Sequence, residues 1–483
     1  MSSASDSAPP PVTAPLDHHE RQITRSFFTL GAGELMARVI GFAATVFAAR
    51  QLGAEAYGII GFAMTLMLYA AMIADLGMEQ YGPREVTDRK GSIDTLVSSI
   101  LLVRFAFSSA LALVLAAVGL LVLTEPEGST VALYSLALLA VGANAKWVHV
   151  GLDRSGTAST ARLIAESVKL LAVVSLVRGP ADFYVVPLAH VAGDSLGALW
   201  MLVAMRAAGV RPRFVIDRTL TTTALAHARP LLLTGVLGML LYNADVVMLR
   251  IFRDRTEVGL YIVAYTLLNF LGVLGGVITL SVLPTLRRLR DDLRRRDDIY
   301  FTAMARALAA GLPIAVGGAL LATPLIELVF GPAYQRSASA LSILIWTFPL
   351  LLLRSVEQGA LIAHGRQDRV LHITAIAAVL NVGFNLIAVP RFGMLGAAAT
   401  TLIAEIVRYL LARRFAALAT FPRISMGRLW RPVLACMVMA VAVRLLGPLH
   451  ALLSVSIGAA VYVIVLVATG AIAYANGRVE LRM

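Results

Sequence analysis

Long apolar runs recur along the whole chain and alternate with short polar segments. A helix rises about 1.5 Å per residue, so about 20 residues cross the apolar core of a bilayer. On that length, the pattern predicts about fourteen membrane-spanning helices. Their predicted ranges are 27–49, 57–77, 95–123, 130–150, 160–178, 183–205, 228–250, 257–284, 299–328, 338–361, 370–389, 393–412, 430–447 and 450–474. The runs are rich in Leu, Ala and Val without strict alternation, which favours an all-α protein over an outer-membrane barrel.

The composition agrees with a polytopic membrane protein. The chain is 58% hydrophobic and 15% charged, whereas soluble domains are about 25% charged. The net charge of +13 comes mostly from Arg residues scattered through short loops. That scatter fits membrane topology better than a nucleic-acid-binding patch, so we expect a lipid bilayer and no nucleic acid as partner.

Basic residues also predict the orientation of the chain, because they are about threefold more frequent in the loops on one side of the predicted helices. Cytoplasmic loops carry such an excess of Lys and Arg. We therefore expect both termini in the cytoplasm and a multi-pass protein of the bacterial cytoplasmic (inner) membrane. The main basic groups on this side are Arg21/Arg25, Arg84–Lys90, Arg206–Arg229, Arg287–Arg296 and Arg413–Arg431.

An internal repeat predicts the domain organisation. The distances from Gly58 to Thr65 and Pro83 recur from Gly259 onwards, to Thr266 and Pro284. A repeat with an even number of spans predicts two parallel six-helix bundles, related by a pseudo-twofold axis around a central cleft. The predicted parts are a disordered cytoplasmic tail (1–22), the N-terminal bundle (23–206), a cytoplasmic connector (207–227), the C-terminal bundle (228–414), two additional helices (415–475) and a cytoplasmic tail (476–483).

Enzymatic motifs are missing from the sequence. It contains no G-x-x-x-x-G-K-[ST], H-E-x-x-H or G-x-S-x-G, and its one cysteine, Cys436, lies within an apolar run. We therefore expect no cofactor, no metal and no catalytic residues. A membrane glycosyltransferase or ligase, the alternative from another class, would usually need a large aqueous loop. No predicted outward loop exceeds roughly a dozen residues, and no filter-like repeat favours a channel.

Charged residues within the predicted spans mark the candidate site. Each costs about 2.5–3.5 kcal/mol at the bilayer centre on insertion scales, so such residues are functional candidates by default. Glu34 and Arg38 lie one turn apart in the first span, with Arg38 about 16 Å along the helix, near the midplane. Arg354 and Glu357 form a similar pair in the tenth span. Because these two pairs are the deepest and lie in different halves, we expect them to line the cleft. Ion pairing within each helix, which lowers the insertion cost, is the alternative.

Asp245 is the first candidate for coupling to H+ or Na+. It lies in the seventh span beside Asn243 and has no cation within one helical turn. It must therefore find a partner on another helix, face water or take up a proton. Glu34 and Asp194 are further coupling candidates.

The remaining polar residues of the spans have simpler interpretations. Asn381 and Asn385 either face the cleft or join two helices by hydrogen bonds. The pairs Glu166/Lys169 and Glu405/Arg408 are interpreted as structural ion pairs within single helices.

The expected chemistry of the cleft follows from these groups. Arg keeps its charge in a low-dielectric cleft and binds phosphate through paired hydrogen bonds. A neighbouring acid can take up a proton or cation and change that attraction. The expected cargo is an anionic amphiphile such as a phosphate-linked lipid. The residues predicted to bind it are Arg38, Glu34, Arg354, Glu357, Asn243, Asn381 and Asn385.

Three passages carry a resemblance to a known family. They are "RQLGAEAYGIIGFAMTL" (50–66), "WVHVGLDRSG" (147–156) and the segment 361–405, which contains Asn381, Asn385, Pro390 and Gly393. Together they resemble the oligosaccharide-lipid flippases of polysaccharide biosynthesis, in the multidrug/oligosaccharidyl-lipid/polysaccharide exporter superfamily. The resemblance extends over essentially the whole chain.

The resemblance implies a function. These flippases move undecaprenyl-pyrophosphate-linked oligosaccharide, such as an O-antigen, exopolysaccharide or capsule repeat unit, across the cytoplasmic membrane by alternating access. A polymerase and glycosyltransferases of the same pathway are then expected as partners. A drug/cation antiporter or a lipid II flippase of the same superfamily is the nearest alternative. The buried Arg residues count against the antiporter.

Overall fold

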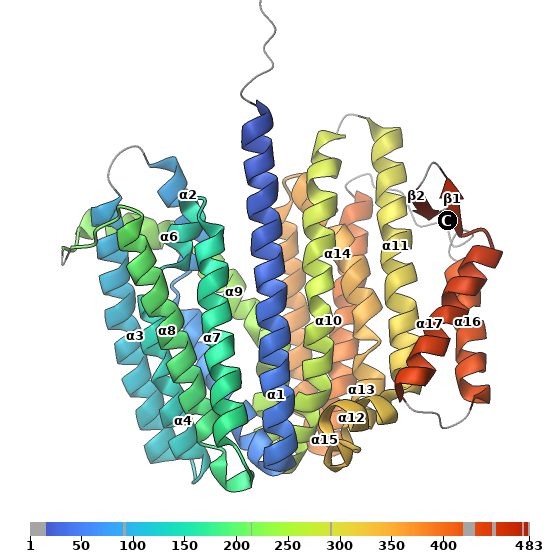
Figure 1. Ribbon diagram of the computed structural model, residues 1–483, viewed down its shortest axis with the longest axis horizontal. Coiled ribbons are helices and arrows are strands. Elements are labelled where there is room, and N and C mark those ends of the chain that lie inside the picture. Colours follow the sequence, from blue (N-terminus) through green and yellow to red (C-terminus); the bar gives the residue numbers. More distant parts are fainter. Residues whose placement is uncertain are drawn as a thin grey trace, which may run out of the picture.

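The computed structural model describes residues 16–89, 93–213, 215–289, 292–418, 430–446, 451–475 and 478–481. It consists of two helical bundles that lie side by side (Figure 1), so the predictions of an all-α fold and of two bundles are confirmed. Most of the predicted N-terminal tail, residues 1–15, lies outside the described residues, and the first helix begins at Leu16.

The helices follow the chain order from one bundle to the other. The N-terminal bundle contains α1 (Leu16–Ala74), α2 (Met78–Asp88), α3 (Asp94–Val122), α4 (Glu127–Ser135), α5 (Ala137–Ala143), α6 (Lys146–Gly151), α7 (Ser155–Leu176), η1 (Pro180–Asp182) and α8 (Val185–Ala207). The C-terminal bundle contains α9 (Arg218–Phe252), α10 (Arg255–Arg288), α11 (Leu293–Leu320), α12 (Ala322–Phe330), η2 (Pro332–Tyr334), α13 (Ser337–Leu344), α14 (Thr347–Ala363) and α15 (Gln367–Leu418).

Every predicted span contains helix within the described residues, and two pairs of spans are joined. The fourteenth, predicted for 450–474, is helical only to Ala468, and its last residues lie in a short strand. α1 contains the first two spans and turns at Gly53, and α15 contains the eleventh and twelfth and turns at Gly393. Both glycines have positive φ, 77° and 56°, a region that other residues avoid. Among the described residues, ten helical segments are long and apolar enough to cross a membrane. This number counts each joined pair once, and it omits α7, which carries three charges, and the short helix of the thirteenth span.

The bundles bury small and aromatic residues inside and leave large aliphatic residues outside. The C-terminal core packs Tyr261, Tyr300 and Phe348, all with no exposed surface. By contrast, Leu113 and Leu121 on the outside of the N-terminal bundle are 73% and 84% exposed. An exterior of this kind is what a lipid-facing surface requires.

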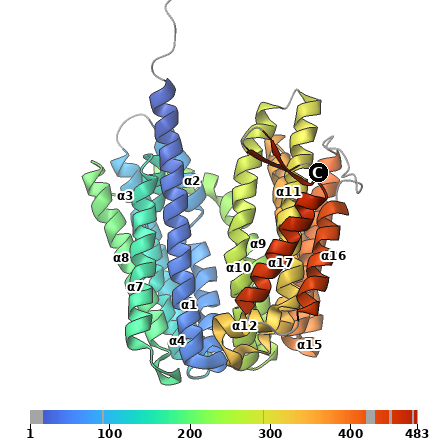
Figure 2. The ribbon, with the colours of Figure 1, turned by 45° about the vertical axis from the view of Figure 1, so that its right-hand side comes forward.

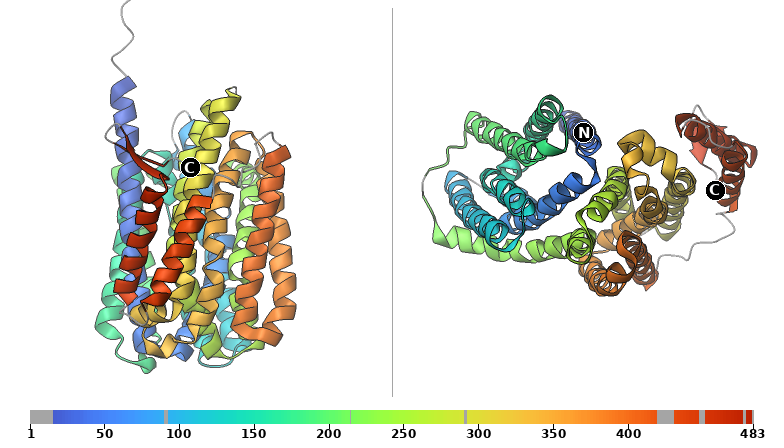
Figure 3. Two further views of the ribbon diagram at one scale, coloured as in Figure 1. Left: turned by 90° about the vertical axis from the view of Figure 1, so that its right-hand side faces the viewer. Right: turned by 90° about the horizontal axis from the view of Figure 1, so that it is seen from below.

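α9 connects the two bundles and packs on both. Its first turns place Leu220, Ala224 and Ala228 against the N-terminal core, whereas Val246 and Leu249 belong to the C-terminal core. Seen along the helices, α9 runs from one bundle to the other (Figure 3). Part of the predicted connector 207–227 is thus helical, since α9 begins at Arg218.

Two further helices, α16 (Trp430–Leu445) and α17 (Ala451–Ala468), lie at the edge of the C-terminal bundle (Figure 2). They pack on α11, where the Tyr462 hydroxyl donates a hydrogen bond of 2.8 Å to the Ala309 carbonyl. The chain then forms a small antiparallel hairpin, β1 (Ile472–Ala475) and β2 (Arg478–Leu481), in which Ile472 pairs with Leu481. β2 lies within the predicted C-terminal tail.

Candidate functional site

A cavity of about 500 Å³ lies within the N-terminal bundle. Its walls come from both halves of α1, from the α5–α6 segment, and from α7 and α8. All its lining residues fall between Glu34 and Met201, so this cavity belongs to one bundle. Arg38 lies about 22 Å along α1 from the kink at Gly53, which is within the thickness of a bilayer core.

Glu34 is shared by two cations at this cavity. Its carboxylate lies 3.7 Å from Nε of Arg38, one turn away on α1, and 3.9 Å from a guanidinium nitrogen of Arg162 on α7. Both distances exceed those of hydrogen bonds, so these are loose ion pairs. The side chains of Arg38 and Arg162 are 41% and 46% exposed. Two partly exposed guanidinium groups therefore share Glu34 at the cavity through loose contacts.

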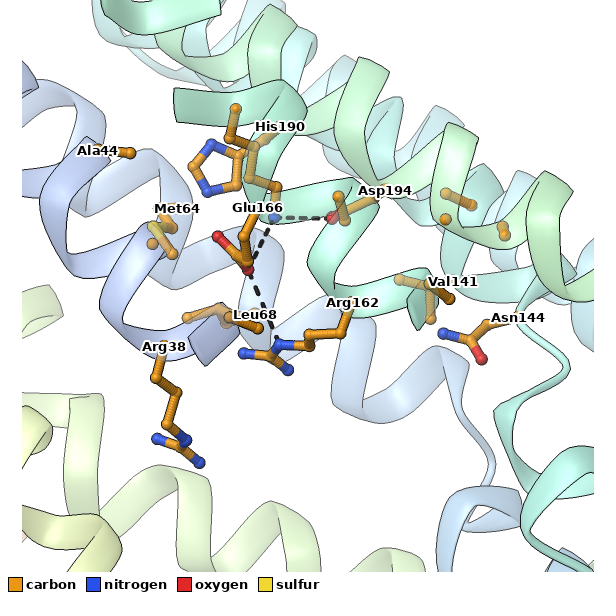
Figure 4. Close-up of a pocket in the computed structure, with 18 of the residues that line it drawn as sticks. Arg38, Ala44, Met64, Leu68, Val141, Asn144, Arg162, Glu166, His190 and Asp194 are labelled. Atoms are coloured by element: carbon orange, nitrogen blue, oxygen red, sulfur yellow. Dashed lines mark ion pairs between the residues drawn. The ribbon is translucent and has the colours of Figure 1, made fainter. Parts of the chain in front are cut away.

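The ion pairs continue from Arg162 into the bundle. Arg162 lies 3.8 Å from Glu166, which lies 3.5 Å from Nζ of Lys169, and Lys169 lies 2.7 Å from Asp194 on α8. Figure 4 shows this succession crossing from α7 to α8. Exposure falls from the Arg162 side chain, 46% exposed, to the Lys169 side chain, 10% exposed. The inner pairs therefore hold the helices together, whereas the outer cations face the cavity. Hereafter we call Arg38, Glu34, Arg162, Glu166, Lys169 and Asp194 the charge ladder.

The far end of the cavity is more apolar. Nδ1 of His190 donates a 3.1 Å hydrogen bond to the Val186 carbonyl, and the His190 ring lies edge-on to Tyr134. Ile60, Met64 and Val173 complete this end. A charged mouth and an apolar interior give the cavity the amphipathic character that a lipid-linked anion requires.

The kink face, where α1 turns at Gly53, is closed by contacts between the bundles. Glu127, at the start of α4, is almost fully buried and pairs with Arg250 of α9 and, at 3.0 Å, with Arg255 of α10. On the other side, Nε of Arg50 donates a 2.7 Å hydrogen bond to the Val329 carbonyl of α12. These contacts join each bundle to the other at one face of the molecule.

The structure places the predicted charges of the tenth span outside the cavity. Arg354, which is predicted to line the cleft, forms a 2.6 Å ion pair with Glu405 of α15, whose second oxygen faces Arg408. It also donates a 3.1 Å hydrogen bond to Gln358 of its own helix. Glu357 is fully buried and lies 3.5 Å from Arg413. These side chains reach the adjacent helix because both face the interior of the bundle. Their role in binding cargo stays a prediction.

The predicted polar residues of the seventh and eleventh spans also lie outside the cavity lining. Asn385 donates to Oδ1 of Asn381 at 3.1 Å and accepts a 2.5 Å hydrogen bond from Thr400, so the two asparagines join both halves of α15. Asn243 donates a 3.4 Å hydrogen bond to its own helix, at the Met239 carbonyl.

Asp245 is 1% exposed and finds its partners on other helices. Tyr261 of α10 donates a hydrogen bond to Oδ2, and Thr401 of α15 donates another at 3.3 Å. Within the described chain, this carboxylate forms no ion pair with a cation. A buried carboxylate held by two hydroxyl groups and the Val246 backbone nitrogen is able to take up a proton or a small cation.

The structure therefore brings Glu34, Arg38 and Asp194 together and separates them from the C-terminal candidates. It also adds Arg162, Glu166 and Lys169 to the cavity. Arg162 lies at the start of the fifth predicted span and is not among the candidate residues predicted from the sequence, and Glu166/Lys169 are interpreted there as a structural pair. The available signal was the spacing of Arg162 one turn before Glu166, which continues the charged stripe along one face of α7.

A chain of apolar helices with an amphipathic cavity in one of two repeated bundles is a multi-pass membrane protein of the transporter type. Residues 23–290, more than half of the chain, match the family model described as polysaccharide biosynthesis protein. The chain belongs to this family.

Curated relatives come from Haloferax volcanii. The probable flippase AglR is 29% identical over 188 residues, which are 38% of this chain and 39% of that protein. This match thus spans about two fifths of the relative's length. The probable low-salt glycan biosynthesis flippase Agl15 is 21% identical over 403 residues, covering 80% of this chain and 82% of the relative.

Solved structures share the fold. The lipid II flippase MurJ in an inward closed conformation matches with a TM-score of 0.76 and 15% identity, over 91% of this chain and 98% of that one. An inward-facing multidrug resistance MATE transporter of the MOP superfamily matches with a TM-score of 0.62 and 16% identity, over 79% and 95%. At these identities the likeness concerns the fold alone.

Proposed function

We propose that this protein is a flippase that moves undecaprenyl-pyrophosphate-linked oligosaccharide across the bacterial cytoplasmic membrane. The observation that carries the proposal is the pair of cavity-facing guanidinium groups, Arg38 and Arg162, which meet their carboxylate partners Glu34 and Glu166 only through loose ion pairs. The family match and the flippase names of the two relatives support it.

The two arginines suit a pyrophosphate. A guanidinium group donates paired hydrogen bonds to phosphate oxygens. Within the described chain, neither Arg38 nor Arg162 makes a hydrogen bond, and their ion pairs with Glu34 are 3.7 and 3.9 Å long. The pyrophosphate therefore gains donors without displacing short bonds. If one arginine turns to the pyrophosphate, Glu34 keeps the other as its partner, which limits the free energy lost when the first ion pair breaks.

Translocation requires the cavity to open first to one side of the membrane and then to the other. We assign the kink face to the outer side, in keeping with the excess of basic loops on the opposite face. Separation of Glu127 from Arg250 and Arg255 would open that face. Asp245, with its hydroxyl partners, is the proposed site of coupling to H+ or Na+, and transport involves no covalent chemistry.

Transport into the interior of proteoliposomes tests the proposal. Purified protein is reconstituted, and loss of a fluorescent undecaprenyl-pyrophosphate-linked oligosaccharide from the outer leaflet is followed with a membrane-impermeant quencher. We expect Arg38→Ala and Arg162→Ala each to slow transport at least tenfold. Arg84→Ala is the matched control, because the Arg84 side chain is 81% exposed and, among the residues that the structure describes, pairs only with its helix neighbour Asp88.

Two outcomes would overturn the proposal. One is unchanged transport by Arg38→Ala at equal protein density. The other is a wild-type protein that moves lipid II or a cationic drug while leaving the oligosaccharide lipid in place, which would assign it to one of the two alternative transporter types.

A further inference from the structure

The fourth span is broken where it lines the cavity. The chain leaves the helical conformation at Asn144, which has an extended ψ of 118°, between the end of α5 and the start of α6 at Lys146. Backbone groups freed within a membrane need partners, and such breaks are tolerated where the chain is buried in protein or lines a water-filled cavity. Val141, Asn144 and Lys146 all line the cavity.

A buried arginine holds the break in place. Arg104 of α3, with 2% of its side chain exposed, donates hydrogen bonds of 2.9 Å to the Asn144 carbonyl and 3.1 Å to the Val141 carbonyl. Its charge is balanced by Asp75 at 2.9 Å. The guanidinium thus satisfies the carbonyl groups that the break releases, and an ion pair between two other segments fixes the local conformation.

This conformation presents one amide group to the cavity. Oδ1 of Asn144 accepts a 2.8 Å hydrogen bond from the Lys146 backbone nitrogen, which fixes the side chain. Within the described chain, Nδ2 of Asn144 has no hydrogen-bond partner. Figure 4 shows the Asn144 amide and the Arg162 guanidinium at the same open space, with Arg38 at the opposite side of the view. Lys146 also lines the cavity, and its ammonium group pairs with Glu79.

We propose that Asn144 and Lys146 form a sugar subsite that recognises the first sugar of the cargo, next to the pyrophosphate held by Arg38 and Arg162. This inference rests on the proposed function and deepens it. The ligand group is an acceptor oxygen, and the acetamido carbonyl of an N-acetylated sugar fits best, because it offers two lone pairs and no competing donor on the same atom. Nδ2 of Asn144 donates to this oxygen. Lys146, held by Glu79, keeps the subsite polar.

The substitution Asn144→Asp separates recognition from structure. An aspartate oxygen still accepts from the Lys146 backbone nitrogen, so the break keeps its cap, but the donor to the sugar is replaced by a charged acceptor. Asn144→Ser serves as the uncharged second variant, since a hydroxyl group is also able to cap while the amide nitrogen is removed. Both variants should melt in detergent at the same temperature as the wild type, which would establish that the break in the fourth span keeps its conformation.

Two probes measure the subsite and the pyrophosphate site independently. Dissociation constants are determined in nanodiscs for undecaprenyl pyrophosphate and for undecaprenyl-pyrophosphate-N-acetylglucosamine. We expect both Asn144 variants to weaken binding of the sugar-bearing lipid about tenfold, as for a lost hydrogen bond in a desolvated site. Binding of the bare carrier should stay within about twofold of wild type. Arg38→Ala should weaken both lipids alike.

The outcomes distinguish the two proposals. Equal binding of the sugar-bearing lipid by wild type and Asn144→Ser would overturn the sugar subsite, as would equal weakening of both lipids. If Arg38→Ala leaves the bare carrier bound as tightly as wild type, the pyrophosphate site fails, whatever the Asn144 variants do.

Discussion

Gly58 and Gly259 face each other where α1 crosses α10. A Cβ atom at Gly58 would overlap the carbonyl oxygen of Arg255, and one at Gly259 would overlap the carbonyl oxygen of Ala54. Gly58 follows Ala54 by four residues, and Gly259 follows Arg255 by the same four residues. The two halves of the repeat therefore meet through equivalent backbone atoms, as expected at a pseudo-twofold axis. Small residues allow such close helix contacts in membranes.

Substitution at this crossing should weaken the contact between the bundles. We expect Gly58→Ala and Gly259→Ala each to lower stability by about 1–3 kcal/mol, because backbone atoms on both sides must move to admit the methyl group. Thermal unfolding in detergent measures the effect. Gly272→Ala, also on α10, is the control: nothing lies within 4 Å of a Cβ there, so the change should be neutral or stabilising. Equal melting temperatures for all three variants would contradict the close contact.

The fold was largely predictable, because the spacing of apolar runs reports span length and the matched positions of Gly58 and Gly259 report the repeat. The joined spans of α1 and α15 were not evident. They depend on the backbone conformations of Gly53 and Gly393, and a glycine in a loop and one at a kink look alike in a sequence.

The candidate site was predictable only in part. Glu34 and Arg38 could be recognised because they are close in sequence and lie deep in an apolar span. Arg162 belongs to another helix, so its approach to Glu34 depends on the packing of α7 against α1, which periodicity does not determine. The ion pair of Arg354 was not predictable for the same reason, because its partner Glu405 comes from another helix.

Glu127 provides a test of the closed kink face. We expect Glu127→Gln to loosen this face, because two guanidinium groups lose the carboxylate that they share. A cysteine at Ala44 in the cavity, introduced together with Cys436→Ser, should then react several times faster with a membrane-impermeant maleimide added from the outer side. Glu125→Gln is the control, because Glu125 lies two residues away and its side chain is exposed. This substitution should leave the labelling rate unchanged. Equal labelling rates with and without the Glu127→Gln substitution would show that this contact does not close the face.

Lys169 should be a structural residue of the charge ladder. Its ammonium group lies between Glu166 and Asp194, so Lys169→Met leaves two carboxylates close together with one cation fewer. We expect a loss of about 3–5 kcal/mol, as for a buried ion pair deprived of one member. The double variant Lys169→Met/Asp194→Asn should recover much of this stability, because Glu166 keeps Arg162 as its partner. Chemical unfolding of both variants measures these changes in the free energy of unfolding. If the double variant is no more stable than the single one, the carboxylates are not the source of the loss.

Asp245 should determine how transport responds to ions. The carboxylate is buried among Tyr261, Thr401 and the Val246 backbone nitrogen, so a bound proton or Na+ would neutralise a charge that otherwise faces neutral hydrogen-bond donors. The substitution Asp245→Asn mimics the neutral state permanently, because an amide group carries no charge at any pH. We expect this variant to transport cargo at a rate that no longer changes with an imposed pH or Na+ gradient, whereas the wild-type rate changes severalfold.

The measurement is cargo flipping in proteoliposomes with the gradient imposed by dilution, first of H+ and then of Na+. Asp88→Asn is the control, because Asp88 is 68% exposed and pairs only with Arg84, and it should retain the wild-type response. A variant at Asp245 that follows both gradients as wild type does would exclude this carboxylate as the coupling group. Glu34 and Asp194 would then be the remaining candidates, both within the charge ladder, where uptake of a proton would release Arg38 or Lys169 directly at the cavity.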